Sequence, residues 1–266
     1  MANNKFQRYE IKFLLTKEQK YNLKELMIKY MQPTEYSVST INNIYYDTDD
    51  HLLIRRSLEK PIYKEKLRVR SYGTATEDSK VFIELKKKFD GVVYKRRIAT
   101  SEKEACKFLN KENSEIQESQ ISKELNYCLK YYPTIKPAMY LSYDREAFEG
   151  IHDKDFRMTF DENILARETD IDLKHGPKGQ ALIDENQTIL EVKTALAIPQ
   201  WLLEFLSENK IYKTSFSKYG TAYQKITLKN QRMTNYLTNK ALILDRVKTN
   251  KLTNNTEKRE HYYAIN

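Results

Sequence analysis

Basic residues recur at every second position in residues 64–70 of this chain. They are Lys64, Lys66, Arg68 and Arg70. Side chains alternate between the two faces of a β-strand, so these four would lie on one face. Two like unit charges about 4 Å apart repel by roughly 4 kcal/mol at an effective dielectric constant of about 20. A row of basic residues that is kept despite this repulsion indicates a surface that binds a polyanion.

Charged residues alternate in the same way in several other segments. Any one of them could be the ordinary solvated face of a sheet, where acidic and basic residues are interspersed. However, the basic face of residues 64–70 holds no acid, and elsewhere Glu stands singly beside Lys. If these faces point into a small barrel, the lumen becomes a cationic tunnel that suits a narrow anion and excludes duplex DNA. The further same-face groups are Arg8, Glu10 and Lys12; Glu84, Lys86 and Lys88; Val93, Lys95 and Arg97; Tyr143 and Arg145; Arg157, Thr159 and Asp161; and Glu191 and Lys193.

The composition narrows the possible partners. The 266 residues include 46 Lys and Arg against 37 Asp and Glu, for a net charge of +9, which suits nucleic acid, a membrane surface or a phosphorylated metabolite. The basic residues follow strand alternation instead of forming a surface studded with aromatic residues, which argues against nucleic acid. We find no apolar run of 18 residues and no signal peptide, and we expect Cys106 and Cys128 to be reduced. We therefore expect a cytoplasmic protein without a transmembrane segment of its own.

The pattern of apolar residues predicts an α+β fold, an antiparallel eight-stranded β-barrel with helices in the connections. Thr16 and Gln19 form a capping box that opens a helix to about residue 31, and Ser101 with Glu104 forms another. Asp90-Gly91 predicts a hairpin turn. We expect one domain over residues 1–228 and a polar tail over 229–266, partly helical or disordered. Strands are expected at 6–15, 41–46, 64–72, 80–89, 92–100, 139–148, 155–161, 163–168 and 188–197, and helices at 17–31, 52–58, 101–132 with a break near 113, and 199–209.

Nine short segments, taken in order, resemble the vacuolar transporter chaperone (VTC) domain. This domain is the polyphosphate polymerase branch of the triphosphate tunnel metalloenzyme superfamily. Each segment is weak alone, and together they span roughly residues 5–225. They are RYEIKF at 8–13, IYYDT at 44–48, KLRVRSY at 66–72, FIELK at 82–86, KRR at 95–97, LSYDR at 141–145, RMTFD at 157–161, ILEVK at 189–193 and SFSKY at 215–219.

The resemblance implies a triphosphate tunnel fold whose basic side chains bind the phosphates of ATP, with Mn²⁺ or Mg²⁺ held by a carboxylate. It also implies transfer of the γ-phosphoryl group of ATP to a growing inorganic polyphosphate chain. Carried over by motif, the metal ligand is Glu191, and the catalytic residues are Arg68, Arg70, Lys86, Arg145 and Lys218. The phosphate-binding residues are those five together with Lys12, Lys95, Tyr143, Arg157 and Ser217.

The chain also departs from the family pattern. The sequences of hydrolytic relatives begin with the pattern Glu-x-Glu-x-Lys. Here Arg8 stands at the first Glu position and only Glu10 is kept, which argues against a hydrolase. Ser215 stands where a lysine is expected, and Lys213 is a candidate substitute. We find no segment resembling the phosphate-sensing domain or the membrane helices of eukaryotic VTC proteins, so a membrane-protein partner stays open. The alternatives are an inorganic triphosphatase or nucleotide phosphatase on the same fold, and a non-catalytic polyphosphate-binding module.

Overall fold

The computed structural model describes residues 9–90 and 92–238. The chain divides into two compact units, residues 1–223 and 224–266. In the second unit, residues 224–238 are helical, and the rest of the predicted tail lies outside the described residues. Arg8 and Gly91, used in the sequence predictions, also lie outside them. No helix in the described ranges has the length and apolar character needed to cross a membrane.

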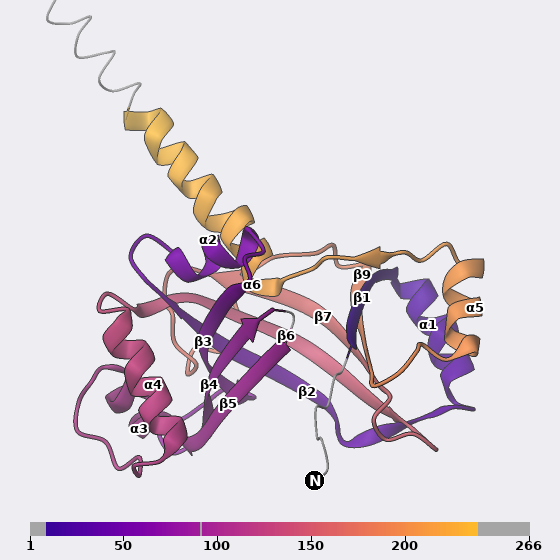
Figure 1. Cartoon of the computed structure of the whole chain (residues 1–266). Helices are drawn as coiled ribbons and strands as arrows, with labels where there is room; N and C mark the ends of the chain where they lie inside the picture. The colour runs from indigo at the N-terminus through magenta and orange to yellow at the C-terminus, as the bar shows by residue number, and fades with distance from the viewer. Residues whose placement is uncertain (1–8, 91, 239–266) are drawn as a thin grey trace, which may run out of the picture. The chain divides into compact units, whose positions relative to one another are not determined.

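The first unit is an α+β structure built on one antiparallel sheet (Figure 1). The α+β class predicted from the sequence is therefore confirmed. The strands are β1 (Tyr9–Thr16), β2 (Met31–Asp47), β3 (Tyr63–Tyr72), β4 (Lys80–Phe89), β5 (Val92–Ser101), β6 (Lys136–Gly150), β7 (Arg157–Arg167), β8 (Gln180–Ala181), β9 (Gln187–Thr194) and β10 (Lys213–Thr214). The helices are α1 (Lys17–Met27), α2 (Leu52–Leu58), α3 (Glu102–Leu109), α4 (Gln120–Tyr131), α5 (Gln200–Glu208) and α6 (Lys218–Ala222), followed by a π-helical turn, η1 (Tyr223–Thr227).

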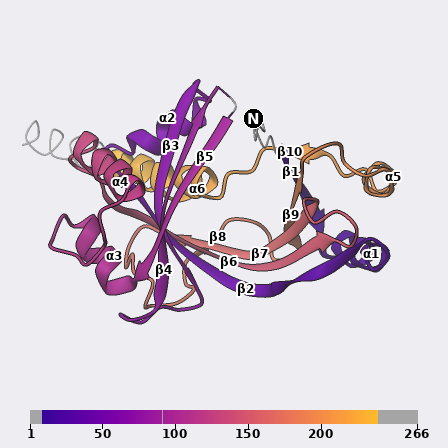
Figure 2. The same cartoon turned by 60° about the horizontal axis from the view of Figure 1, so that its bottom comes forward.

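The sheet curls without closing into a ring. Its order is β10-β1-β9-β7-β6-β2-β3-β4-β5, with β8 added on β7, so β10 and β5 are the two ends. Figure 2 shows β2, β6 and β7 as a curved floor, from which β3–β5 rise on one side and β1, β9 and β10 on the other. The described strands thus number ten and form an open trough, where the sequence predicted an eight-stranded closed barrel. Sequence periodicity is local and does not report whether the two distant edges of a sheet meet.

The two faces of the sheet differ sharply in character. On the β3–β5 wall, the apolar face, including Leu67 and Leu85, packs beneath helices α3 and α4. On the opposite wall, Phe13 and Leu190 belong to one core with residues of α1 and α5, and Figure 1 shows these two helices beside β1 and β9. Burying one such side chain contributes about 1.5–3 kcal/mol. The stabilising cores therefore lie outside the trough, which leaves its inner face to the charged residues of opposite parity.

Local sequence signals set most of the element boundaries. Thr16 and Gln19 form the predicted capping box at α1, with both hydrogen bonds present. Ser101 caps α3, but the Glu104 carboxylate accepts from Lys107 and from the Glu115 N–H, so the second predicted box is only half formed. The predicted break near residue 113 is present, between α3 and α4.

Three predicted boundaries are wrong, the first because of long-range pairing and the last because of local hydrogen bonds. Helix α1 ends at Met27, since the chain from Met31 pairs with β6 and extends β2 to 17 residues. The two strands predicted at 155–161 and 163–168 are one strand, β7, in which Asn163 adopts a positive φ of 48°. Strand β9 ends at Thr194, whose hydroxyl donates to the Ala197 carbonyl and accepts from the Leu196 N–H.

Candidate functional site

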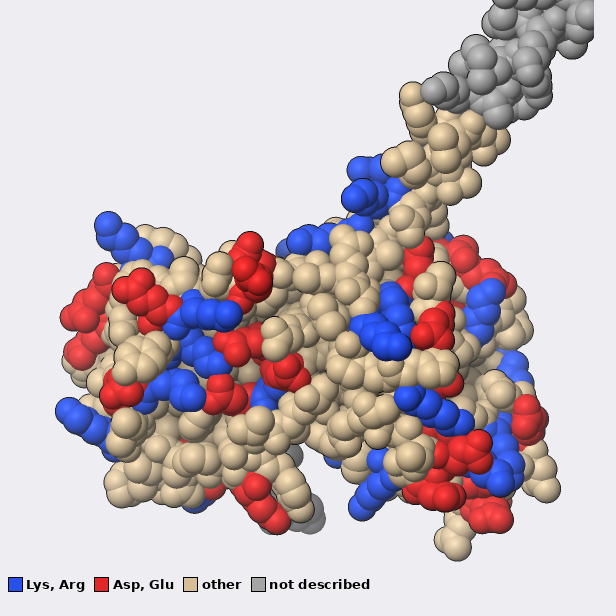
Figure 3. Space-filling model, turned by 180° about the vertical axis from the view of Figure 1, so that it is seen from behind, with Lys and Arg blue, Asp and Glu red and all other residues tan. Residues whose placement is uncertain are grey.

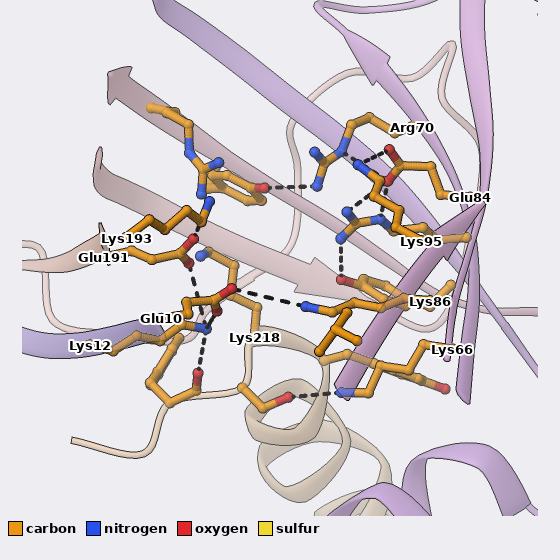
Figure 4. Close-up of a pocket in the computed structure, with 18 of the residues that line it drawn as sticks. Glu10, Lys12, Lys66, Arg70, Glu84, Lys86, Lys95, Glu191, Lys193 and Lys218 are labelled. Carbon is orange, nitrogen blue, oxygen red and sulfur yellow. Dashed lines mark hydrogen bonds and ion pairs between the residues drawn. The ribbon is translucent and has the colours of Figure 1, made fainter. Parts of the chain in front are cut away.

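The inner face of the trough encloses a cavity of about 800 Å³ (Figure 4). Side chains from both walls and from the floor line it, together with residues 216–219, which run into α6. The cavity brings together all eleven residues singled out from the sequence, although their roles remain predictions. They are Lys12, Arg68, Arg70, Lys86, Lys95, Tyr143, Arg145, Arg157, Glu191, Ser217 and Lys218.

The lining of this cavity is strongly cationic. Ten basic side chains and three carboxylates line it, whereas basic and acidic residues are interspersed on the face of the molecule in Figure 3. A concave surface with this imbalance attracts anions from solution. The basic residues are Lys12, Lys66, Arg68, Arg70, Lys86, Lys95, Arg145, Arg157, Lys193 and Lys218, and the acids are Glu10, Glu84 and Glu191.

On the β3–β5 wall, the buried carboxylate of Glu84 holds the basic residues in place. It accepts hydrogen bonds from Arg68 Nε at 2.7 Å and Arg97 Nε at 2.7 Å, and pairs with Lys95 Nζ at 2.7 Å. Burial raises the pKa of Glu84, but the charges of Arg68 and Arg70 outweigh it and keep the pKa well below its usual range. Glu84 therefore stays ionised. It fixes the guanidinium groups of Arg68 and Arg97 and leaves some of their N–H groups free to donate to an anion.

On the floor of the trough, Asp161 of β7 has the same role. Arg145 donates to both of its carboxylate oxygens, at 2.6 and 2.7 Å, and Lys218 also pairs with it. Burial raises the pKa of Asp161, but Lys218 and Arg145 lower it further than burial raises it. Lys218 also lies over the Tyr143 ring, 4.4 Å from its centroid. The sequence put Asp161 on the correct face but gave it no role.

Glu191 lies in a cluster of two acids and two lysines. It pairs with Lys193 Nζ at 2.6 Å and with Lys12 Nζ at 3.6 Å, and Lys12 also pairs with Glu10 at 3.2 Å. Burial raises the pKa of Glu191, but Lys193 and Lys12 hold it well below its usual range. The strand partner of Glu191, Thr159, has a buried hydroxyl without a hydrogen-bond partner among the described residues.

The carboxylates of the cavity fit a divalent metal site that uses few protein ligands. No group of three or more His, Cys, Asp or Glu side chains placed to hold a metal occurs in the described ranges. Mg²⁺ needs no such cage, because it keeps several waters and binds through one or two carboxylates together with substrate phosphates. Glu10 and Glu191, which share Lys12 as a partner, are the two carboxylates that suit this mode.

Two lining residues, Tyr45 and Lys66, were absent from the sequence-predicted site. The Tyr45 hydroxyl accepts from Arg68 at 3.0 Å, and Lys66 Nζ donates to Ser217 Oγ at 3.2 Å. Burial raises the pKa of Tyr45, but Arg68 and Lys66 lower it to about 8. Burial lowers the pKa of Lys66 to about 8 against the effect of Tyr45. Strand alternation in the sequence had already put Lys66 on the basic face. This alternation was the signal that could have identified Lys66 as a site residue.

Several other titratable residues lie outside this cavity. Arg96 and Lys87 pair with Glu124 of α4 at 3.0 and 3.6 Å, on the outer face of the sheet. Lys213, the candidate substitute for a lysine at 215, is exposed and does not line the cavity. His175 pairs with Asp170 and does not line it either.

Comparisons with known proteins found a matching family model and similar solved structures. The model of the VTC domain matches residues 7–227. A solved structure from Hippeastrum, of a proposed adenylyl cyclase described as having a dominant triphosphatase activity, has a TM-score of 0.50 at 14% identity and covers 82% of this chain and 96% of that one. A proposed adenylate cyclase from Bacillus halodurans has a TM-score of 0.48 at 17% identity, covering 82% of this chain and 95% of that one. No curated protein gave a match.

The two groups with a pKa of about 8 predict how anion binding depends on pH. Above pH 8, Lys66 loses its positive charge and Tyr45 gains a negative one, so the affinity for tripolyphosphate falls as the pH rises. Each group contributes up to about tenfold per pH unit. Calorimetric titrations at pH 7, 8 and 9 measure this, and Lys66→Arg removes the contribution of Lys66. An equal pH dependence in wild type and Lys66→Arg contradicts the prediction.

Replacing Glu84 should lower stability and increase stabilisation by anions. In Glu84→Gln, Arg68, Arg97 and Lys95 lose their shared carboxylate, and we expect the free energy of unfolding to fall by about 3–5 kcal/mol. Added tripolyphosphate should then raise Tm more than in wild type, because it replaces the missing charge. Glu124→Gln, on the outer face, is the matched control and should cost about 1 kcal/mol or less. Equal losses in the two variants would count against a special role for Glu84.

Proposed function

This chain belongs to the VTC domain family, and on that premise we propose that it is a polyphosphate polymerase. The proposed reaction transfers the γ-phosphoryl group of ATP to the end of an inorganic polyphosphate chain inside the cavity. A terminal phosphate oxygen of the chain attacks the γ-phosphorus, the bond from that phosphorus to the bridging β,γ-oxygen breaks, and ADP leaves. The chain grows by one phosphate.

The observation that carries the proposal is the charge of the cavity. Ten basic side chains against three carboxylates exceed what the triphosphate group of one nucleotide can neutralise. The basic residues also form two groups, one around Glu84 on the β3–β5 wall and one around Asp161 on the floor and Glu191 on the wall of β1 and β9. Two groups of this kind suit two polyanions held end to end, a donor and an acceptor.

Phosphoryl transfer depends mainly on positioning and on electrostatic stabilisation. Arg68 and Arg145 are held by carboxylates through one edge, which leaves other guanidinium N–H groups for phosphate oxygens in the forked geometry that arginine favours. Lys12, Lys86 and Lys218 supply charges on flexible stems. A divalent metal at Glu10 and Glu191 would offset charge on the phosphate oxygens when bound.

The carboxylates of the site favour a phosphate acceptor over water. Activating water needs a base with a pKa near the working pH, but the pKa values of Glu84, Asp161 and Glu191 are all held below their usual range by neighbouring cations. Burial and Glu191 raise the pKa of Glu10, yet Lys12, Lys86 and Lys193 lower it overall. An ionised phosphate acceptor needs no such base. The triphosphatase remains the second candidate, since the Hippeastrum protein on this fold is described with that activity.

The test is to incubate the protein with γ-labelled ATP and Mn²⁺ or Mg²⁺, with and without a short polyphosphate primer, and to separate the products on a gel. We expect a ladder of labelled polymer that falls by about 10²–10³-fold in Arg68→Ala, because a charge-stabilising donor is lost. Glu191→Gln should also lose the ladder. Arg96→Ala, which changes a neighbouring basic residue on the outer face, is the matched control and should keep it.

Two other outcomes of this experiment would reject the proposal. Labelled phosphate without a ladder identifies a triphosphatase. Neither product, with tight polyphosphate binding retained, identifies a non-catalytic binding module.

A further inference from the structure

The basic row of β3 and β4 continues beyond the cavity. Lys66 and Lys86 are directly opposite each other across the two strands, and both line the cavity. Two residues further along, Lys64 and Lys88 are opposite each other in the same way. Two residues along a strand span about 7 Å and return to the same face of the sheet. The second pair therefore extends the cationic face by one step past the cavity.

Lys64 and Lys88 line a second cavity, of about 420 Å³, that nothing in the proposed reaction uses. It lies where the loop between α2 and β3 meets the end of β4, since the Asp90 N–H donates to the Ile62 carbonyl at 3.0 Å. Its other lining residues are Lys60, Pro61, Ile62 and Asp90.

The lysines of this second cavity outnumber its acids, because three lysines line it together with one carboxylate, Asp90. Within the described ranges, none of Lys60, Lys64 and Lys88 forms an ion pair, in contrast to the basic residues that Glu84 and Asp161 hold in the first cavity. Lys64 Nζ donates to the Ser57 carbonyl at 3.2 Å, which orients it without removing its charge. Burial lowers the pKa of Lys64, and Lys88 and Lys60 lower it further by repulsion. The three lysines therefore form a site of net positive charge that could bind an anion.

We propose that this second cavity is an outer subsite for the internal phosphate groups of a long polyphosphate chain whose end lies in the first cavity. The proposal rests on the function proposed above. The row from Arg70 to Lys64 spans about 20 Å, at roughly 3.3 Å per residue, and is longer than one triphosphate group needs. A polymer several phosphates long can contact both cavities at once, which a single nucleotide cannot do.

Continuity with the first cavity favours polyphosphate over an anionic membrane surface. Lysines beside an exposed apolar residue such as Ile62 also suit a lipid headgroup layer. However, the strand register puts Lys64 and Lys88 in line with Lys66 and Lys86 on the inner face of the trough. A linear polyanion can follow that line from one cavity to the other.

The experiment compares the binding of two anions that differ only in length, tripolyphosphate and long-chain polyphosphate. The test variant combines Lys60→Gln, Lys64→Gln and Lys88→Gln. The matched control combines Lys29→Gln, Lys103→Gln and Lys130→Gln, three exposed lysines that line neither cavity, and removes the same net charge. Dissociation constants are measured by calorimetry at several salt concentrations, with no turnover required.

We expect the test variant to bind long-chain polyphosphate about tenfold more weakly, and tripolyphosphate within about twofold of wild type. The slope of log affinity against log salt for the long chain should fall by about 2, taking roughly 0.7 per phosphate contact as in single-stranded nucleic acids. The control triple variant should leave the length discrimination unchanged.

Three results would overturn the outer subsite. One is an unchanged affinity of the test variant for the long chain, and another is an equal loss for both anions. The third is a loss of binding to phosphatidylserine vesicles alone, which would assign the cluster to a membrane surface. A wild type that makes no polymer but keeps this length-dependent binding would reject the polymerase and retain the subsite, so the two failures are distinguishable.

Discussion

Mutual repulsion among the basic side chains on the inner face of one sheet is the constraint on which the rest of the structure depends. Three buried or nearly buried carboxylates, Glu84, Asp161 and Glu191, offset part of it, and each contacts at least two cations. The apolar cores beneath the helices supply the folding free energy that the inner face does not. Stability and anion binding are therefore assigned to opposite faces of the same strands.

The same constraint explains why the site and its polarity could be predicted from the sequence. Strand alternation is a local property, so residues 64–70 alone indicate a basic face opposite Leu67. Capping signals are equally local, and Thr16 with Gln19 predicted the start of α1. The grouping of the candidate residues came from a resemblance that covers most of the chain, and all eleven line one cavity.

What the sequence could not provide depends on partners distant in the chain. The extension of β2 to Met31 is set by pairing with β6, more than 100 residues away. Asp161 lies within a recognised motif, but its role appears only when Arg145 and Lys218 converge on it. The pKa of Lys66 likewise depends on its surroundings, because burial is the largest cause that lowers it. None of these relations leaves a periodic trace in the sequence.

Side chains, rather than a backbone ladder, span the opening of the trough. Lys12 of β1 donates to the Phe216 carbonyl at 3.1 Å, and Lys66 of β3 donates to Ser217 Oγ at 3.2 Å, so opposite walls hold one segment. Tyr219 anchors its end by donating to Asp47 at 2.9 Å and stacking on Tyr45. A closed barrel would need a row of strand hydrogen bonds to break before it opened. Here the span depends on a few contacts, two of them made by lysines that also line the cavity, so the charges that attract the anion also help to hold the segment above it.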